Sequence, residues 1–327
     1  VIASASPLLM LEINDADTFN ITEYGGSAEN IISDSITGGT IDENGIITPD
    51  DNSAKVTYKY KYNDKGDTIT CSIAFGIAID KVNFPDENFR NWLLEQNYGE
   101  DGVLTAEEIP SVEKIDVTNK FISDLKGIEY FTSLKMLYCS SNDLTSLDVS
   151  KNTALTSLNC SSNKLTSLDL SKNTALTSLN CNSNKLTSLD LSKNTALTEL
   201  NCHSNKLTSL DLSKNTALTV LYCYYNNLTS LDLSKNTALT WLNCHSNQLT
   251  LLDLRNSTNL TSLVCGDNQL TSLDVSKNTA LTELECSDNQ MTSLDLSKNI
   301  NLTQLYCSYN QLTSLDVSKN TNLTRLE

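Results

Sequence analysis

The strongest constraint on the fold is a 21-residue period that fills the C-terminal part of the chain. Cysteine, asparagine and aspartate all recur at this step. The cysteines stand at Cys139, Cys160, Cys181, Cys202, Cys223, Cys244, Cys265, Cys286 and Cys307. Nine units run from Leu134 to Asn322, and a tenth begins at Leu323. A fixed period of this length predicts a solenoid, in which each unit contacts only its sequence neighbours.

Each unit has two halves. The first reads Leu-x-x-Leu-x-Cys-x-x-Asn-x-Leu, as in Leu155 to Leu165, and the second reads Leu-Thr-Ser-Leu-Asp-Leu-Ser-Lys-Asn-Thr-Ala, as in Leu165 to Ala175. Alternation points Leu158 and Cys160 inward and Asn159 outward, so stacked units form a parallel sheet with strands about 4.8 Å apart. Aromatic residues make up only 6% of the chain, so stacked leucines must supply the core.

The first half of the unit matches the conserved segment of leucine-rich repeats, and nine copies in register make that match specific. Residues 134–327 resemble this family, and the segment from Val112 through Leu125 resembles an internalin-type repeat. The resemblance implies a mainly β fold, in which residues 112–327 form a right-handed leucine-rich-repeat solenoid behind a helical N-terminal cap. It also implies an asparagine ladder after the strands and a bacterial surface or secreted protein. We further expect the Asp-Leu-Ser segment to form short strands on the opposite face.

Residues 1–80 carry a different pattern. Val56–Tyr62 and Ile69–Ile79 alternate around a turn at Asn63–Asp67, which predicts a hairpin. Thr40–Gly45 gives a second turn before Ile46–Pro49. This segment resembles a small bacterial immunoglobulin-like β-sandwich, complete or truncated at its N-terminus, and its expected role is that of a spacer.

Residues 81–111 are expected to form the helical cap. A helix is predicted from Asp86 to Gln96, because Phe89, Trp92 and Leu93 then share one face. Thr105 and Glu108 have the spacing of a capping box. A cap is expected at a solenoid end, where the core would otherwise be open to water.

The loop from Asn97 to Glu108 aligns with an EF-hand loop. Its candidate calcium ligands are Asn97, Asp101 and Glu108, but Asn97 has no charge and Gly99 has no side chain at a ligand position. We therefore favour a degenerate loop that turns the chain, with a weak calcium site as the alternative. No cofactor is expected.

The repeated cysteines and aspartates are interpreted as structural. The cysteines lack Cys-x-x-Cys spacing and occupy inward positions, so we expect buried thiols; Cys71 is also inward-patterned and has no obvious partner. The aspartates lack the glycine pattern of calcium-binding β-rolls. Each aspartate is instead followed three residues later by lysine, as Asp169 is by Lys172, except that Asp253 has Arg255 nearby, and the expected result is a structural surface ladder.

Charge and composition exclude several functions. The net charge is −17, and 24 of the 40 acidic side chains lie in residues 1–133, so nucleic-acid binding is not expected. The longest apolar run, Ile73–Ile79, is too short to span a membrane. His203 and His245 lie two coils apart, and no catalytic set is recognisable, so we expect no enzyme. Because Val1 is not an initiator methionine, the chain is interpreted as a mature or trimmed fragment of an extracellular protein.

The repeats differ most from one another in units four to six. There the outward positions carry aromatic residues where other units carry Ser, Asn or Thr, and we call this set the aromatic patch: His203, Val220, Tyr222, Tyr224, Tyr225, Trp241, Asn243 and His245. Beside it we define an acidic patch: Asp267, Glu283, Glu285 and Asp288. Tyr306 and Tyr309 follow farther on. Exposed aromatic residues are typical of interaction sites, although self-association and neutral variation are alternatives.

These observations predict a non-enzymatic adhesion or binding module that recognises a protein through the exposed strand face of the solenoid. One alternative is a carbohydrate-binding module, in which Tyr224 and Trp241 stack on sugar rings. Another is a structural stalk. The ligand, whether protein or glycan, is not identified by the sequence.

Overall fold

The computed structural model describes residues 18–24, 26–50, 55–63, 65–74 and 76–327. Residues 1–17 of the predicted 1–80 domain therefore lie outside the described residues. The chain divides into two compact units, Val1–Val112 and Glu113–Glu327, which are treated separately below. The finer division at residues 80 and 111 stays a prediction.

The first unit contains two three-stranded antiparallel sheets and one short helix. One sheet has the order β1-β4-β3 and the other the order β2-β5-β6. The strands are β1 (Phe19–Asn20), β2 (Ile31–Thr37), β3 (Gly39–Ile41), β4 (Ile46–Pro49), β5 (Lys55–Lys61) and β6 (Thr68–Ala74), with 3-10 turns η1 (Ile21–Tyr24) and η2 (Ala28–Asn30). Phe19 and Ile47 of the first sheet share one core with Val56, Tyr58 and Ile73 of the second. The predicted immunoglobulin-like identity of these sheets stays a prediction.

Both predicted hairpins are present, with one correction. β5 pairs with β6 along its whole length, and β3 pairs with β4 across a turn in which the Asp42 carboxylate accepts the Ile46 N–H at 2.8 Å. The predicted strand from Ile69 to Ile79 is wrong in its second part. β6 ends at Ala74, and β7 (Ile77–Ala78) pairs instead with β8 (Val103–Leu104). Between them Gly76 adopts φ +145°, where a side chain would lie 2.4 Å from the Leu104 carbonyl.

The predicted helix and capping box are confirmed. α1 spans Glu87–Leu94, and the Asp86 carboxylate caps it by accepting the Phe89 N–H at 3.0 Å. The side chains of Phe89 and Leu93 are fully buried. In the capping box, Glu108 accepts the Thr105 N–H at 3.0 Å while the Thr105 hydroxyl accepts the Glu108 N–H at 3.1 Å, ahead of η3 (Ile109–Ser111).

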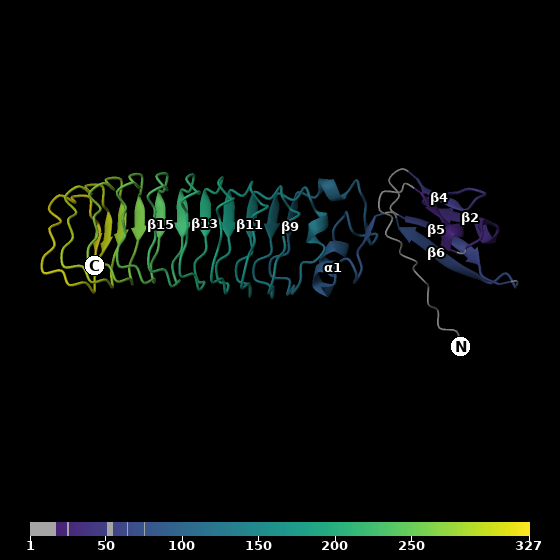
Figure 1. Ribbon diagram of the computed structural model, residues 1–327, viewed down its shortest axis with the longest axis horizontal. Coiled ribbons are helices and arrows are strands. Elements are labelled where there is room, and N and C mark those ends of the chain that lie inside the picture. The colour runs from purple at the N-terminus through teal and green to yellow at the C-terminus, as the bar shows by residue number, and fades with distance from the viewer. Residues whose placement is uncertain (1–17, 25, 51–54, 64, 75) are drawn as a thin grey trace. The chain divides into compact units, whose positions relative to one another are not determined.

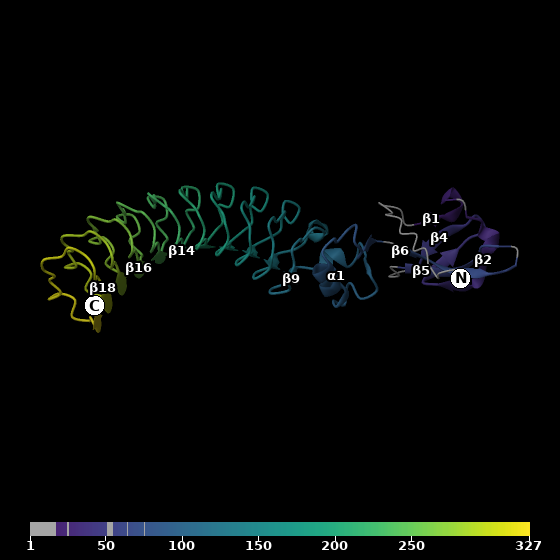
Figure 2. The same cartoon turned by 90° about the horizontal axis from the view of Figure 1, so that it is seen from below.

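The second unit is a solenoid with one 11-stranded parallel sheet, whose strands stack in chain order from β9 to β19 (Figure 1). Figure 2 shows that this sheet lies on the inner side of the solenoid's curve. We name each coil by its strand. The strands are β9 (Lys114–Asp116), β10 (Met136–Tyr138), β11 (Ser157–Asn159), β12 (Ser178–Asn180), β13 (Glu199–Asn201), β14 (Val220–Tyr222), β15 (Trp241–Asn243), β16 (Ser262–Val264), β17 (Glu283–Glu285), β18 (Gln304–Tyr306) and β19 (Arg325–Leu326), and η4 (Ile128–Tyr130) follows β9.

Leucine and cysteine columns fill the solenoid core, as predicted. Leu158 and Cys160 are buried, and the strands pair in register so that equivalent residues stack. All ten cysteines, which lie in the described part of the chain, are free thiols. Burial raises the pKa of Cys202 to about 12, so the thiol stays neutral and packs as a small apolar group. The buried-thiol interpretation is confirmed for the nine repeat cysteines, while Cys71 is only half-buried.

The predicted asparagine ladder is also confirmed. The Asn163 amide donates to the carbonyls of Cys139 and Cys160, at 3.0 and 3.1 Å. Its side-chain oxygen accepts the Leu144 N–H at 3.0 Å, so each ladder residue joins two coils. Backbone groups that the turn leaves without strand partners are thereby satisfied inside the protein.

A second asparagine ladder, which the sequence analysis missed, runs through the other half of the repeat. The Asn173 amide donates to the carbonyls of Val149 and Asn152, both at 2.9 Å, and the residue is fully buried. Equivalent residues repeat this contact at Asn152, Asn194, Asn215, Asn236, Asn278, Asn299 and Asn320. The short strands expected in this half are wrong for the described coils, because side-chain amides rather than a strand ladder join the neighbouring backbones here.

Ser257 interrupts the second ladder, and its buried hydroxyl has no partner among the described residues. We expect Ser257→Asn to raise the free energy of unfolding by about 1 kcal/mol, because the amide reaches the carbonyls that its equivalents reach in other coils. Chemical denaturation measures the change. Thr258→Asn, at the exposed neighbouring position, is the control and should have little effect; an equal gain there would contradict the ladder explanation.

The aspartate column stabilises turns instead of pairing with lysine. The Asp169 carboxylate accepts the Ser171 N–H at 2.9 Å, and this backbone hydrogen bond is the largest cause lowering its pKa. The charge of Lys172 adds a smaller lowering effect. The predicted structural ladder is therefore a column of turn-closing side chains, with the lysines as a secondary contribution.

Candidate functional site

The aromatic patch lies across the β13, β14 and β15 coils. Val220 and Tyr222 belong to β14, while Trp241 and Asn243 belong to β15. The remaining members, His203, Tyr224, Tyr225 and His245, lie in the turns that follow the strands. The outward positions of the patch therefore extend from the strands into the turns, and four of the eight members lie on a strand. Each strand is only three residues long because the chain enters a turn after the inward cysteine.

Ring contacts join the turn residues of the patch into a row. The His203 and Tyr224 rings stack at 4.1 Å between centroids with an interplanar angle of 14°. Tyr224 meets Tyr225 edge-on at 5.4 Å, and Tyr225 meets His245 edge-on at 5.8 Å. The row thus crosses three successive coils without a gap.

The strand residues of the patch form a second contact beside this row. The Tyr222 and Trp241 rings lie 6.3 Å apart at 47°. Val220 is directly opposite Trp241 in the sheet register, and Tyr222 is opposite Asn243. The structure therefore brings the predicted members together as one surface. Because the rings pack on one another, their positions are preorganised in the protein without a partner.

Tyr225 is the most exposed member of the patch, with 56% of its surface accessible, and it has a left-handed backbone with φ 51°. Equivalent turn residues in every coil from β10 to β18 share this conformation; elsewhere they are Ser or Asp, except for Tyr309, which is 81% exposed. A bulky side chain is uncommon in this region of backbone space. An exposed tyrosine with this backbone conformation contributes little to the stability of the fold, which makes Tyr225 a candidate contact residue.

An ion pair joins the aromatic patch to the acidic patch. His245 Nδ1 lies 3.8 Å from Glu285 Oε2, two coils away. The Glu285 carboxylate also accepts the N–H groups of Gly266 at 3.1 Å and Ser287 at 3.0 Å. A Cβ at Gly266 would lie 2.5 Å from Glu285 Oε2 and would displace the carboxylate from this position. The sequence predicted that the two patches are neighbours, and the structure shows them in contact.

The charges across this ion pair shift both pKa values. Interaction with the Glu285 carboxylate raises the pKa of His245, against burial, which lowers it. Burial alone would raise the pKa of Glu285, but the nearby His245 imidazole and the hydrogen bonds from the Ser287 and Gly266 N–H groups outweigh it and lower that pKa. The arrangement therefore favours a charged carboxylate beside the imidazole.

The other acidic-patch residues stay near the surface. The Ser246 hydroxyl donates to Asp267 at 2.6 Å, and the Ser262 hydroxyl donates to Glu283 at 3.0 Å. Asp288 is exposed at a left-handed turn position. The ion pairs of the described chain bring no lysine or arginine to these carboxylates. They remain available to a partner of opposite charge.

Two of the three candidate calcium ligands form hydrogen bonds within the protein. Asp101 accepts the Val103 N–H at 3.0 Å, and Glu108 is committed to the capping box with Thr105. The residues that the structure describes hold no group of three or more His, Cys, Asp or Glu side chains suited to a metal ion. The degenerate-loop interpretation and its calcium alternative stay predictions.

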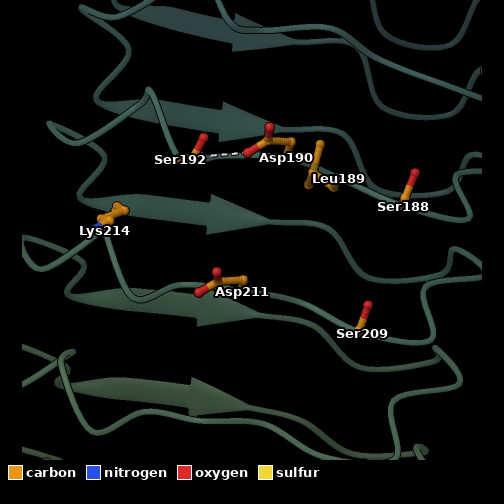
Figure 3. A pocket seen from close by; sticks show the side chains of 7 residues that line it. All are labelled: Ser188, Leu189, Asp190, Ser192, Ser209, Asp211 and Lys214. Carbon is orange, nitrogen blue, oxygen red and sulfur yellow. Dashed lines mark hydrogen bonds between the residues drawn. The ribbon is translucent and has the colours of Figure 1, made fainter.

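Small hollows on the opposite half of the repeat are a property of the scaffold. Figure 3 shows one of about 250 Å³, lined by Ser188, Leu189, Asp190, Ser192, Ser209, Asp211 and Lys214. The dashed line there is the turn-closing bond from the Ser192 N–H to Asp190. A hollow of the same volume recurs one coil earlier. The hollow is therefore a feature of the repeat and does not mark a binding site in one particular coil.

Among the described residues, no helix has both the length and the apolar character needed to cross a bilayer. This observation concerns only those residues.

Known proteins share the repeat and its stacking. The family model for Leucine Rich repeats (2 copies) matches residues 279–320. Internalin J of Listeria monocytogenes serotype 4b is 37% identical over 71 residues, which cover 21% of this chain and 8% of that protein.

Two solved structures extend the likeness. The functional domain of InlJ from Listeria monocytogenes, described as including a cysteine ladder, is 43% identical with a TM-score of 0.71, over 76% of this chain and 55% of that one. The internalin InlF from the same species is 26% identical with a TM-score of 0.56, over 77% and 91% of the two chains. The chain thus spans about half of the InlJ domain and a small part of full-length internalin J.

Stacked parallel strands with buried leucine, cysteine and asparagine columns define a leucine-rich-repeat protein. More narrowly, the cysteine column and the stacked fold are similar to those of the internalins. The predicted mainly β solenoid is confirmed by the same observations.

Proposed function

We propose that this chain is a non-enzymatic cell-surface or secreted binding module that recognises a protein partner through the aromatic patch on the sheet face. Internalin-like leucine-rich-repeat proteins are surface modules for protein interaction, and the relatives found are not enzymes. The observation that carries the proposal is the unbroken row of aromatic rings from His203 to His245, which includes the exposed ring of Tyr225 and ends at the ion pair of His245.

The fold itself does not require these rings. The neighbouring coils place Asn201 and Asn243 where Tyr222 stands, and the sheet register continues unchanged through all of them. Aromatic residues in a binding surface supply large contact area, and tyrosine adds a polar group that can hydrogen-bond to the partner. Pre-packed rings also lose little side-chain entropy on binding. The cost of exposing them to water is best explained by a partner that covers them.

Ring geometry favours a protein partner over a sugar. A sugar stacks on a broad, open aromatic face, but one face of the Tyr224 ring is covered at 4.1 Å by His203, and Trp241 is tilted at 47° to Tyr222, so the rings do not form one flat stacking platform. The edges and hydroxyl groups that remain suit the irregular surface of a protein. The carbohydrate and stalk alternatives are therefore outcomes of the test below.

The repeat provides neutral replacements for this test. Tyr222→Asn, Tyr224→Ser and Trp241→Ser together install the residues that the β11 coil carries at the equivalent positions. In a screen of cell-surface proteins and glycans, we expect wild type to bind a protein and the triple variant to bind it at least about tenfold more weakly, because contact area is lost from the centre of the surface.

The matched control is Tyr138→Asn, which removes an equivalent aromatic residue from β10, outside the patch. It should bind as wild type does, and circular dichroism melting should show that all variants fold. Unchanged binding by the triple variant would refute the aromatic site. A wild-type hit on glycans alone would select the carbohydrate module, and no wild-type hit would select the stalk.

A further inference from the structure

Basic side chains are missing from the sheet face where the two patches meet. The strands and following turns of the β14 to β17 coils contain no lysine or arginine. The residue after the ladder asparagine also loses its positive charge along the solenoid. It is lysine at Lys164, Lys185 and Lys206, and it is uncharged at Asn227, Gln248, Gln269, Gln290 and Gln311. Lysine thus disappears from this position of the repeat at the coil where the patch tyrosines begin. The surface is left with carboxylates and rings.

The same face shows, at both ends of the sheet, how its tyrosines hold a cation. The Arg325 guanidinium lies 5.1 Å from the centroid of the Tyr306 ring in the preceding coil, and Lys114 Nζ lies 5.2 Å from the centroid of the Tyr138 ring. A cation over an aromatic face is attracted by the negative potential of the ring. Tyr222 occupies the column of Tyr306 and Tyr138, but no lysine or arginine stands in the adjacent coils of that face.

The only ion pair that the described acidic patch makes is the one between His245 and Glu285. Asp267, Glu283 and Asp288 receive hydroxyl hydrogen bonds or face solvent, with no compensating cation. Uncompensated carboxylates next to aromatic rings produce a negative potential that attracts and orients a positively charged partner.

We propose that the aromatic and acidic patches form one continuous surface that binds an arginine- or lysine-rich segment of a protein. The basic side chains lie over the rings of the β14 and β15 coils and pair with the carboxylates of the β16 and β17 coils. This inference rests on the proposed function, since it names the chemistry of the partner for the same surface.

The test uses a synthetic peptide of alternating arginine and glycine, with glutamate–glycine and serine–glycine peptides of equal length as controls. Isothermal titration calorimetry on the full chain should show binding of the arginine peptide only. Added salt should weaken that binding, because salt screens exposed charges over about 10 Å at 0.1 M. The salt series needs no substitution, so it tests the electrostatic part of the proposal even if a variant folds poorly.

The variant combines Asp267→Asn, Glu283→Gln and Asp288→Asn, which keep the oxygen atoms that accept the serine hydroxyls. We expect about tenfold weaker peptide binding from the loss of three exposed charge pairs. The matched control, Asp169→Asn with Asp190→Asn and Asp211→Asn, removes the same charge from the turn-closing column of the scaffold and should bind as wild type does. The aromatic triple variant should weaken binding as well.

Three results would overturn the inference: no binding of the arginine peptide, an equal loss in the scaffold control, or full binding by the neutralised patch. Its failure is distinguishable from failure of the proposed function. If a protein partner binds wild type and is lost in the aromatic variant but not in the neutralised one, the binding function stands and the cationic partner is wrong.

Discussion

Asn205→Asp is expected to lower the free energy of unfolding by about 3–5 kcal/mol at pH 7, the range typical of an uncompensated buried charge. The native amide donates to the carbonyls of Cys181 and Cys202, both at 3.1 Å, and its oxygen accepts the Leu186 N–H at 3.0 Å. Aspartate has the same shape, so no cavity forms. It replaces a donor with a charged acceptor that faces two carbonyl oxygens.

This loss should depend on pH in a defined direction. Burial and the facing carbonyls disfavour the charged carboxylate, so the folded-state pKa at position 205 is raised above the unfolded value of about 3.9. At a pH below the unfolded-state pKa, the carboxyl group at position 205 is protonated in both the folded and the unfolded protein, so no buried charge destabilises the fold. The penalty therefore grows as pH rises from about 4 toward 7, and the difference from wild type should be smallest in acid.

Urea unfolding followed by circular dichroism at both ends of this pH range measures the effect. Asn227→Asp is the control, because Asn227 is exposed and lies in the next coil. It should change stability by less than about 0.5 kcal/mol. An equal stability loss in the control, or a loss at position 205 that does not vary with pH, would contradict the role given to the ladder amide.

The periodic part of the fold could be predicted from sequence because the period itself encodes it. Leu158 and Cys160 face inward since alternation in a stacked strand allows little else, and the structure confirms both. The second ladder was missed for a physical reason. Asn173 sits in a Ser-Lys-Asn-Thr segment that looks like a solvated turn, and nothing local shows that its amide reaches carbonyls 21 and 24 residues earlier.

The residues of the candidate site could be named from the sequence, and the structure brings them together, but their geometry could not be predicted. Departure from the repeat consensus identified Tyr222, Tyr224 and Trp241 without any structure. The left-handed backbone at Tyr225 was not deduced, because serine occupies that position in most coils and gives no signal of its own. The contact of His245 with Glu285 depends on Gly266 in the coil between them, a relation across three coils that becomes visible only after stacking.

Leu200→Ala is expected to destabilise the solenoid by about 3 kcal/mol. Leu200 is fully buried at the centre of β13, between Leu179 and Leu221 in register. The substitution removes apolar contacts and leaves a cavity, and costs of about 2–5 kcal/mol are typical of buried leucine. Leu251→Ala is the control, because 66% of its surface is exposed, and it should change stability by less than about 0.5 kcal/mol.

The location of the stability loss in the solenoid is more informative than its magnitude. In a repeat array the free energy of folding is close to a sum over coils and the interfaces between neighbours. The Leu200 cavity should therefore weaken the interfaces with the β12 and β14 coils most, and native-state hydrogen exchange should show lost protection centred on β13. Uniform loss from β9 to β19 would indicate a fully cooperative solenoid instead. Localised loss would also weaken the aromatic patch, because β14 presents Tyr222 and carries the turn that holds Tyr224 and Tyr225.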